Sequence, residues 1–179
     1  MDRQIPDGTM GLGYIQSAEK DYQSKAVSAS GSRELFSKNT TIGFNFASGQ
    51  DRILSVSNSA FDEAMIHQNY SLSISQVLSK QSLAQINYEF RVENGFLASP
   101  YRKAKINNGG VIQAVSENHP RTRNRNALAL KYNYYFKDIG LASAFSYRFY
   151  FDSWAVQSHT IEERLTKTFS EHWLASVSL

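Results

Sequence analysis

The side chains whose types suit hydrolytic chemistry are grouped near residue 155, where Asp152, Ser153, Ser158 and His159 follow one another closely. A serine nucleophile needs a histidine base and a carboxylate that orients the imidazole. A triad is defined by its geometry, however, and a serine and a histidine beside a short loop often occur together by chance. We therefore favour the alternative, that these side chains cap a loop, and expect no enzymatic activity.

The other histidines do not predict a metal site. His67, His119 and His172 are scattered and lack the short regular spacing of metal ligands. The chain has no cysteine, which excludes disulfides, thiolate metal sites and cysteine nucleophiles. It also lacks a Walker loop, a GxGxxG motif and a carboxylate pair with catalytic spacing. We expect neither a metal nor a cofactor.

A second group of charged residues recurs on alternate positions of strand-like segments. These residues fall on the wet face of those segments, opposite the apolar residues: Glu89, Arg91, Lys131, Arg148, Asp152, Glu162 and Arg164. In a membrane barrel they would line the lumen, where they would either set the ion preference of a pore or form an internal salt-bridge network that plugs it.

Positive charge is concentrated in one long loop, between Glu93 and Arg125. The loop carries six basic residues against two acidic ones: Arg102, Lys103, Lys105, Arg121, Arg123 and Arg125. Such a basic extracellular loop would attract anionic solutes or lipopolysaccharide phosphates. The alternative is an ordinary solvated loop. Nucleic acid is not an expected partner, because this loop has no alternating aromatic stacking platforms.

Composition predicts one folded domain over residues 1–179. The chain is 41% hydrophobic and 20% charged, and its net charge of +3 is too small to select a partner. It contains no apolar run of the length of a membrane-spanning helix. The first residues, MDRQIPDGTM, do not resemble a signal peptide.

The elements that position these residues are strands, because apolar side chains recur with a period of two. The clearest strand runs from Leu83 to Val92, and a hairpin follows at 127–152 around the turn 137–140. With this turn, Phe136 lies opposite Leu141 and Tyr132 opposite Phe145, so the apolar faces of the two strands coincide.

Further strands are expected beside these, which gives about eight in all. The additional segments are Tyr22 to Leu35, Thr40 to Ser48, Asn69 to Leu78, His159 to Thr168 and Trp173 to Leu179. Four short polar turns, at 36–39, 78–81, 136–139 and 169–172, alternate with longer connections at 49–62, 93–125 and 153–158. We therefore expect short turns at one end of the sheet and longer loops at the other.

A period of two does not say whether the apolar face meets a core or lipid, since soluble and transmembrane barrels share it. Ten-residue strands, unequal loops and aromatic residues near both strand ends favour a membrane barrel. Glu163 and Lys167 oppose it, because they share a face with Ile161 and Leu165. A soluble lipocalin-like barrel that binds a small apolar ligand remains the alternative.

Several segments resemble an uncharacterised family of bacterial proteins known as domain of unknown function 3570. The segments are GFLASPYRKA, SQVLSKQSLAQINYEF, SENHPRTRNRNALALKYNYYF and SYRFYFDSWAVQSHT. Members look like outer-membrane β-barrels that carry a signal peptide and are longer than this chain. The resemblance implies an antiparallel up-and-down transmembrane barrel in the bacterial outer membrane, of which this chain is a fragment without its signal peptide and C-terminal strands. It implies no activity and no catalytic residues.

We therefore expect an outer-membrane barrel that contacts lipid and lipopolysaccharide. It would act as a passive or selective pore or, alternatively, as a non-conducting structural barrel of the envelope.

Overall fold

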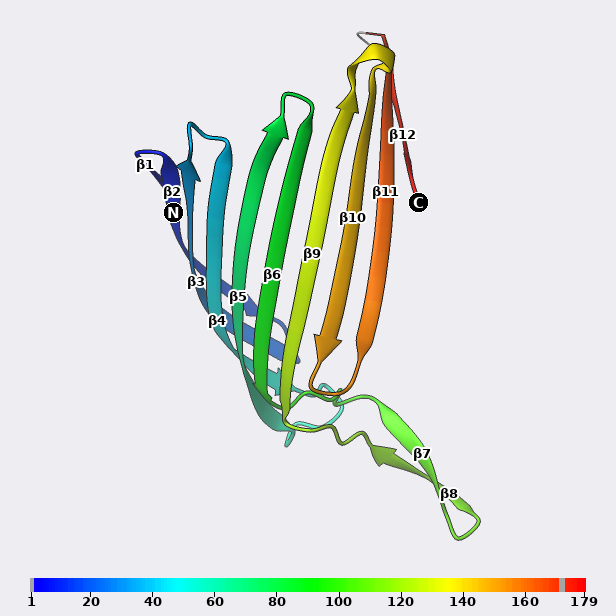
Figure 1. Cartoon of the computed structure of the whole chain (residues 1–179). Coiled ribbons are helices and arrows are strands. Elements are labelled where there is room, and N and C mark those ends of the chain that lie inside the picture. Colours follow the sequence, from blue (N-terminus) through cyan, green and yellow to red (C-terminus); the bar gives the residue numbers. More distant parts are fainter. Residues whose placement is uncertain (1, 171–172) are drawn as a thin grey trace.

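The computed structural model describes residues 2–170 and 173–179, and the described chain is almost entirely β-structure (Figure 1). Ten strands form one antiparallel sheet: β1 (Asp2–Ile5), β2 (Gly8–Ala18), β3 (Tyr22–Leu35), β4 (Thr40–Leu54), β5 (Asp62–Ser79), β6 (Ser82–Gly95), β9 (Thr122–Phe136), β10 (Leu141–Asp152), β11 (Gln157–Ser170) and β12 (Trp173–Ser178). The strands β7 (Lys103–Asn108) and β8 (Val111–Ser116) form a separate hairpin. A single 3-10 turn, η1 (Lys137–Ile139), joins β9 to β10.

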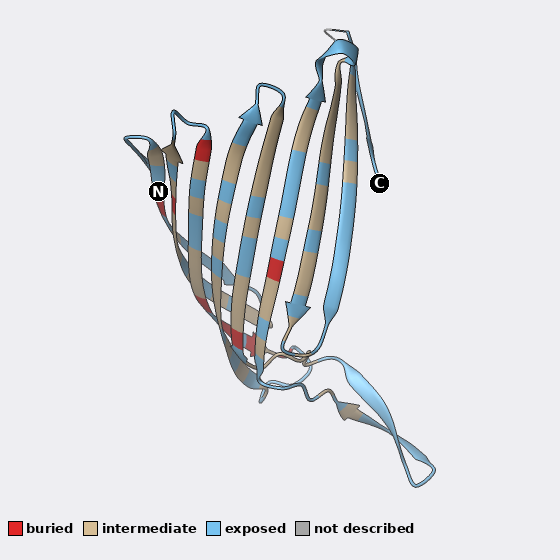
Figure 2. Ribbon diagram, viewed as in Figure 1, coloured by how far each residue is buried: buried red, intermediate tan, exposed pale blue. Residues whose placement is uncertain are grey.

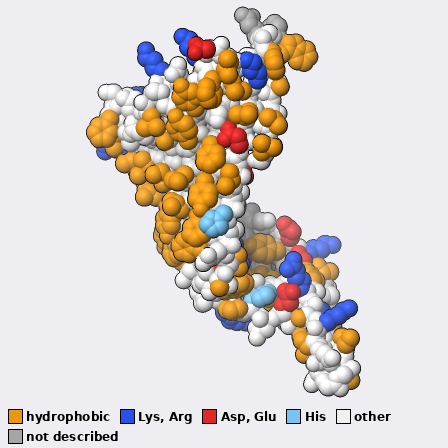
Figure 3. Space-filling view, turned by 45° about the vertical axis from the view of Figure 1, so that its right-hand side comes forward, with side chains coloured by type: hydrophobic (Ala, Val, Ile, Leu, Met, Phe, Trp, Pro, Cys, Tyr) orange, Lys and Arg blue, Asp and Glu red, His pale blue; other side chains and the backbone are white. Residues whose placement is uncertain are grey.

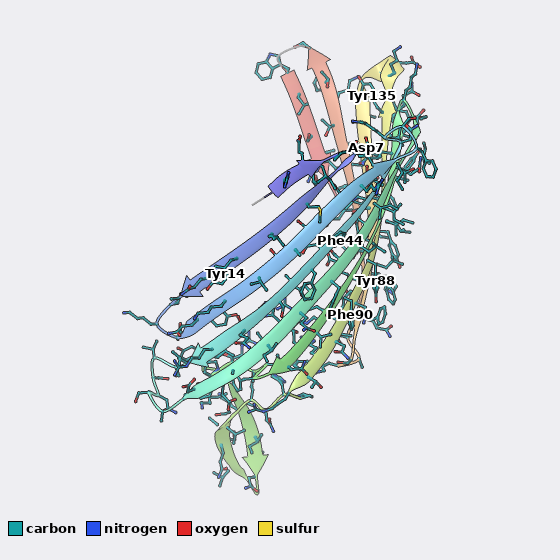
Figure 4. The ribbon with its side chains drawn as sticks, turned by 90° about the vertical axis from the view of Figure 1, so that its left-hand side faces the viewer. Asp7, Tyr14, Phe44, Tyr88, Phe90 and Tyr135 are labelled. Carbon is teal, nitrogen blue, oxygen red and sulfur yellow. The ribbon has the colours of Figure 1, made fainter. Side chains whose placement is uncertain are left out.

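The sheet is a meander in which each strand pairs with its neighbours in sequence. The exception is β6, which pairs with β9 because the β7–β8 hairpin is inserted between them. Within the described residues β1 and β12 do not pair with each other, so the expected closed barrel is not formed and the sheet is open. It curves into a trough with one convex and one concave side (Figures 1 and 4).

All eight predicted strands are present, but the number eight was too low. The strands β1 and β2 were missed, and so was the β7–β8 hairpin inside the predicted loop from 93 to 125. The strands β4 and β5 are longer than predicted, since β4 continues to Leu54 and β5 begins at Asp62. The expected connection at 49–62 is therefore only residues 55–61.

The short and long connections lie at opposite ends of the sheet. The turns at 36–39, 80–81 and 137–140 share one end, called here the turn end. Gly140 closes its turn in the left-handed conformation, with φ 59°, which glycine adopts without strain. The fourth predicted turn, at 169–172, includes Glu171 and His172, which lie outside the described residues. The segments 55–61, 96–121 and 153–156 lie at the other end, the loop end.

The predicted register of the central hairpin is confirmed. Phe136 pairs with Leu141, Tyr134 with Ser143, and Tyr132 with Phe145. The same parity continues across the sheet, so one cross-strand row contains only apolar and ring side chains: Phe44, Leu72, Tyr88, Leu128, Phe149 and His159. The adjacent row, on the opposite face, reads Asn45, Ser71, Glu89, Ala127, Tyr150 and Ser158.

These rows define a convex apolar face and a concave polar face. Tyr88 projects from the convex side of the sheet in Figure 4. Hydrophobic side chains gather over this face in the space-filling view (Figure 3). Phe46, Tyr70 and Phe90 form a ladder of rings along it, with centroid distances of 5.1 and 6.2 Å. The concave face is mostly serine, asparagine, alanine and charged residues.

The described chain has no hydrophobic core of its own. Only Ile53 and Ala127 are buried among its hydrophobic residues, and most of each strand is exposed or half-buried (Figure 2). The accessible surface is 12973 Å², whereas a compact monomer of 20.2 kDa has about 8,700 Å². The apolar face is therefore open to whatever surrounds the sheet.

Candidate functional site

The candidate site residues of the strands lie on the concave face. The register places all seven predicted wet-face residues on it: Glu89, Arg91, Lys131, Arg148, Asp152, Glu162 and Arg164. They span β6 to β11, and their environments differ between the loop end and the middle of the sheet.

Near the loop end, Glu93 of β6 lies between two arginines. Arg91 Nε donates a hydrogen bond of 2.9 Å to Glu93 Oε1. Arg125 Nε lies 2.9 Å from the other oxygen, Oε2, but the two groups are not aligned for a hydrogen bond. The Glu93 side chain is only 5% exposed. A buried carboxylate with two cations is well compensated, and this group leaves a local surplus of one positive charge.

Asp152, the last residue of β10, accepts hydrogen bonds from four residues. Its Oδ2 accepts hydrogen bonds of 2.8 Å from Arg123 Nε and from the Tyr150 hydroxyl. Its Oδ1 accepts from the backbone amides of Trp154 and Val156, at 2.9 and 3.0 Å. Desolvation acts to raise the pKa of Asp152, but these hydrogen bonds outweigh it and lower the pKa to about 2. Asp152 thus fixes the 153–156 loop to the sheet.

A third buried carboxylate, that of Asp51, was not predicted as part of the site. His67 Nδ1 lies 3.0 Å from Asp51 Oδ2, and the Asp51 side chain is 1% exposed. Gly49 makes room for this pair, since a Cβ at Gly49 would lie 2.6 Å from the His67 ring. Burial, followed by the influence of Asp51, raises the pKa of the Tyr22 hydroxyl at the start of β3 to about 12. The sequence analysis assigned Asp51 to a loop, and no pattern in the sequence indicated that it would lie opposite β5.

The middle of the concave face differs, because its cations lack acidic partners. Within the described residues no carboxylate lies within 4.0 Å of Lys131, Arg148 or Arg164. Arg164 Nε donates to the Ser178 hydroxyl at 3.2 Å, and the Arg148 guanidinium lies 5.6 Å from the Tyr150 ring. These three side chains remain available to solutes.

The six residues of the predicted basic loop do not form one collar. Arg123 and Arg125 lie in β9 and pair with Asp152 and Glu93, which corrects their placement in a loop. Arg121 pairs with Glu63 of β5. The remaining three lie in or beside the exposed β7–β8 hairpin: Arg102, Lys103 and Lys105.

The sheet separates the residues that suited hydrolytic chemistry. Ser158 lies opposite Tyr150 on the concave face, on which Asp152 also lies. His159 lies on the convex face, where its Nδ1 is 2.7 Å from the Tyr147 hydroxyl. The histidine and the carboxylate are therefore on opposite sides of the sheet and do not form a relay.

Neither a metal cluster nor a spanning helix is found in the part of the chain that the structure describes. No three His, Asp or Glu side chains come together there as metal ligands. No helix within residues 2–170 and 173–179 has the length and hydropathy needed to cross a membrane.

The two charged residues that opposed lipid contact do lie on the convex face. Glu163 Oε1 accepts a 2.7 Å hydrogen bond from the Ser143 hydroxyl, its neighbour on β10. Lys167 reaches the turn end, where its ammonium group donates to the Ile139 carbonyl. Lys167 is therefore at the edge of the apolar face, and Glu163 is half-buried within it.

Taken together, these contacts make the concave face a polar trough with ion-paired carboxylates near the loop end and three accessible cations in the middle. Such a surface can hydrate and orient small ions or polar solutes. No curated protein matches the chain, and neither does any solved structure. A family model described as a protein of unknown function, DUF3570, matches residues 2–179. The chain therefore belongs to the DUF3570 family.

Proposed function

We propose that this chain forms the wall of a β-barrel in the bacterial outer membrane, with lipid on the convex face and a water-filled pore on the concave face. The observation that carries this proposal is the separation of side chains across the sheet. Large apolar residues stay exposed on the convex face, such as Phe44 at 52%, Leu72 at 48% and Leu128 at 40%. Exposed apolar surface on this scale needs a partner, and a bilayer covers it without a matching protein surface.

Strand length supports the same assignment. A tilted strand needs about 9–11 residues to cross the hydrocarbon layer. The apolar side chains of β9 extend from Leu128 to Phe136, and those of β10 from Leu141 to Phe151. Exposed rings lie at both limits, with Phe36 and Phe136 at the turn end and Phe151 toward the loop end. Aromatic girdles at these heights suit the two membrane interfaces.

A soluble barrel that carries an apolar ligand is disfavoured by the direction of the curvature. Such a barrel needs its apolar residues on the concave side, but the strand register places serines, asparagines and charged residues there. The competing membrane role is a non-conducting envelope barrel, which the buried ion pairs of Glu93 and Asp152 favour because they would rigidify the interior.

A bilayer also demands that every strand edge has a partner. The strand β1 covers only the Gly8–Gly11 part of β2, and β12 covers only the part of β11 nearest the turn end. The proposal therefore requires these edges to pair with each other or with further strands.

Fractionation and conductance test the proposal in sequence. We expect the protein to remain in the membrane fraction until detergent is added, and recovery in the soluble fraction without detergent would overturn the membrane assignment. In planar bilayers the refolded protein should give discrete current steps. A membrane-bound protein that gives no steps would support the non-conducting barrel in place of the pore.

A further inference from the structure

At the loop end, residues 96–101 cross the mouth of the trough as a strap. The strap starts after β6, yet its last residue contacts the β2–β3 turn, three strands away in the sheet. Together with the wall it lines an open cavity of about 420 Å³. The wall side of this cavity is formed by Tyr22, Ile53, Met65, Glu93, Arg125 and Trp154.

Gly95 directs the chain into this path. Its φ of 130° is unfavourable for residues with a side chain, and a Cβ there would lie 2.2 Å from the Ala64 carbonyl oxygen. The amide of Gly95 donates to the Arg121 carbonyl at 2.8 Å, and the amide of Phe96 donates to the Ala64 carbonyl at 2.9 Å. The strap is therefore turned toward β5 by the backbone itself.

Two side chains then hold the strap down. Phe96 packs edge-to-face against Phe61 of the 55–61 loop, with ring centroids 5.2 Å apart. Tyr101 joins two other segments, because its hydroxyl donates a 2.6 Å hydrogen bond to Asp21 Oδ2 and accepts one of 3.0 Å from the Val56 amide. Asp21 and Tyr101 are 80 positions apart in sequence, so this contact ties the strap to a distant segment of the chain rather than closing a local turn.

We propose that the strap is an internal constriction that sets the size limit for solutes, and that Tyr101 is the latch that keeps it across the trough. The size-limit part rests on the proposed pore function. The latch part does not, because it concerns only whether the strap covers the cavity.

Thiol labelling tests the latch directly. The chain has no cysteine, so a single reporter introduced by Met65→Cys, beneath the strap, reacts alone with a charged thiol reagent. In the refolded full chain we expect Tyr101→Phe, and equally Asp21→Ala, to speed labelling of this reporter by about tenfold or more. This factor corresponds to the loss of one hydrogen bond to a charged group.

Two controls separate the latch from a general loosening. The substitution Tyr70→Phe makes the same chemical change at a similarly exposed tyrosine, 43% against 47%. Among the described residues, the Tyr70 hydroxyl donates its hydrogen bond to Gln68 of its own strand. This substitution should leave the labelling rate unchanged. A reporter from Asn45→Cys, on the concave face away from the strap, should not respond to Tyr101→Phe. An unchanged rate at the Met65→Cys reporter in both latch variants would overturn the latch.

Solute uptake by proteoliposomes tests the size limit. With sugars and polyethylene glycols of increasing size, Tyr101→Phe should admit larger solutes than the parent protein does. A conducting parent with an unchanged limit in the variant would refute the constriction and leave the pore intact. A parent that admits no solute would refute the pore and with it the size limit, while the labelling rates would still decide the latch.

Discussion

The orientation of the sheet in the membrane can be tested with one lysine placed on either face of β6. Ile86 lies on the convex face between Ile74 of β5 and Leu130 of β9, and it is 49% exposed. It follows the turn at 80–81 by five residues, which at about 3.3 Å per residue and a 45° tilt places it roughly 12 Å above that turn. The lipid-facing band is about 25 Å tall, so Ile86 lies near its middle.

At that depth a lysine on the lipid face costs about 2–4 kcal/mol. We therefore expect Ile86→Lys to lower the free energy of unfolding in vesicles by this amount. The matched substitution Asn87→Lys, one residue along and on the concave face, should cost less than about 1 kcal/mol. Urea titrations of both variants in lipid vesicles, followed by tryptophan fluorescence, measure the difference. Equal costs for the two substitutions would refute the assignment of the convex face to lipid.

Three further predictions concern charged side chains. The folded pKa of Asp152, about 2, lies below its ordinary value of 3.8, so its contribution to stability is complete above about pH 4 and is lost as the pH falls toward 2. The substitution Asp152→Asn should remove this part of the pH dependence of the urea midpoint. An unchanged pH profile in this variant would contradict the prediction. Replacing Arg148 or Arg164 by Glu should shift the reversal potential in planar bilayers toward cation preference, and a conducting variant with the parent's potential would exclude that residue from the lumen. Glu163→Gln keeps an acceptor for a hydrogen bond but removes a charge from the convex face, so it should raise the urea midpoint in vesicles at pH 7; a lower midpoint would argue against lipid contact at this position.

Much of the fold follows from the period of two. The segments around Tyr132 and Phe145 alternate without interruption and flank a turn of known length, which is enough to derive their register. The strand β2 escaped notice because Gly8, Gly11 and Gly13 interrupt the apolar pattern, and glycine is depleted in strands. The β7–β8 hairpin was hidden inside a long polar loop, although Asn108-Gly109-Gly110 resembles the turn of a hairpin.

The site was less accessible to prediction. Its wet-face residues follow from parity alone, and extending the parity of β6 by two positions beyond Arg91 would have added Glu93. The pair of Asp51 and His67 lies where β4 and β5 extend beyond their alternating apolar residues, so no local sequence pattern predicts it. The side toward which the sheet curves, and the path of the strap, arise from contacts among segments distant in sequence. The alternation of apolar and polar residues therefore predicts neither the direction of the curvature nor the path of the strap.

The meander has a consequence for how the chain acquires its structure. Nearly every strand pairs with the next one in sequence, so most contacts form between neighbours and each hairpin can add to the one before it, a route that favours rapid folding. The pairing of β6 with β9 is the one step that must wait for a long segment, residues 96–121, to be looped out. Because the entropy lost on closing a loop grows only with the logarithm of its length, the insertion adds little to the free-energy cost of pairing β6 with β9. The long segment at the loop end therefore adds little to the cost of forming the sheet.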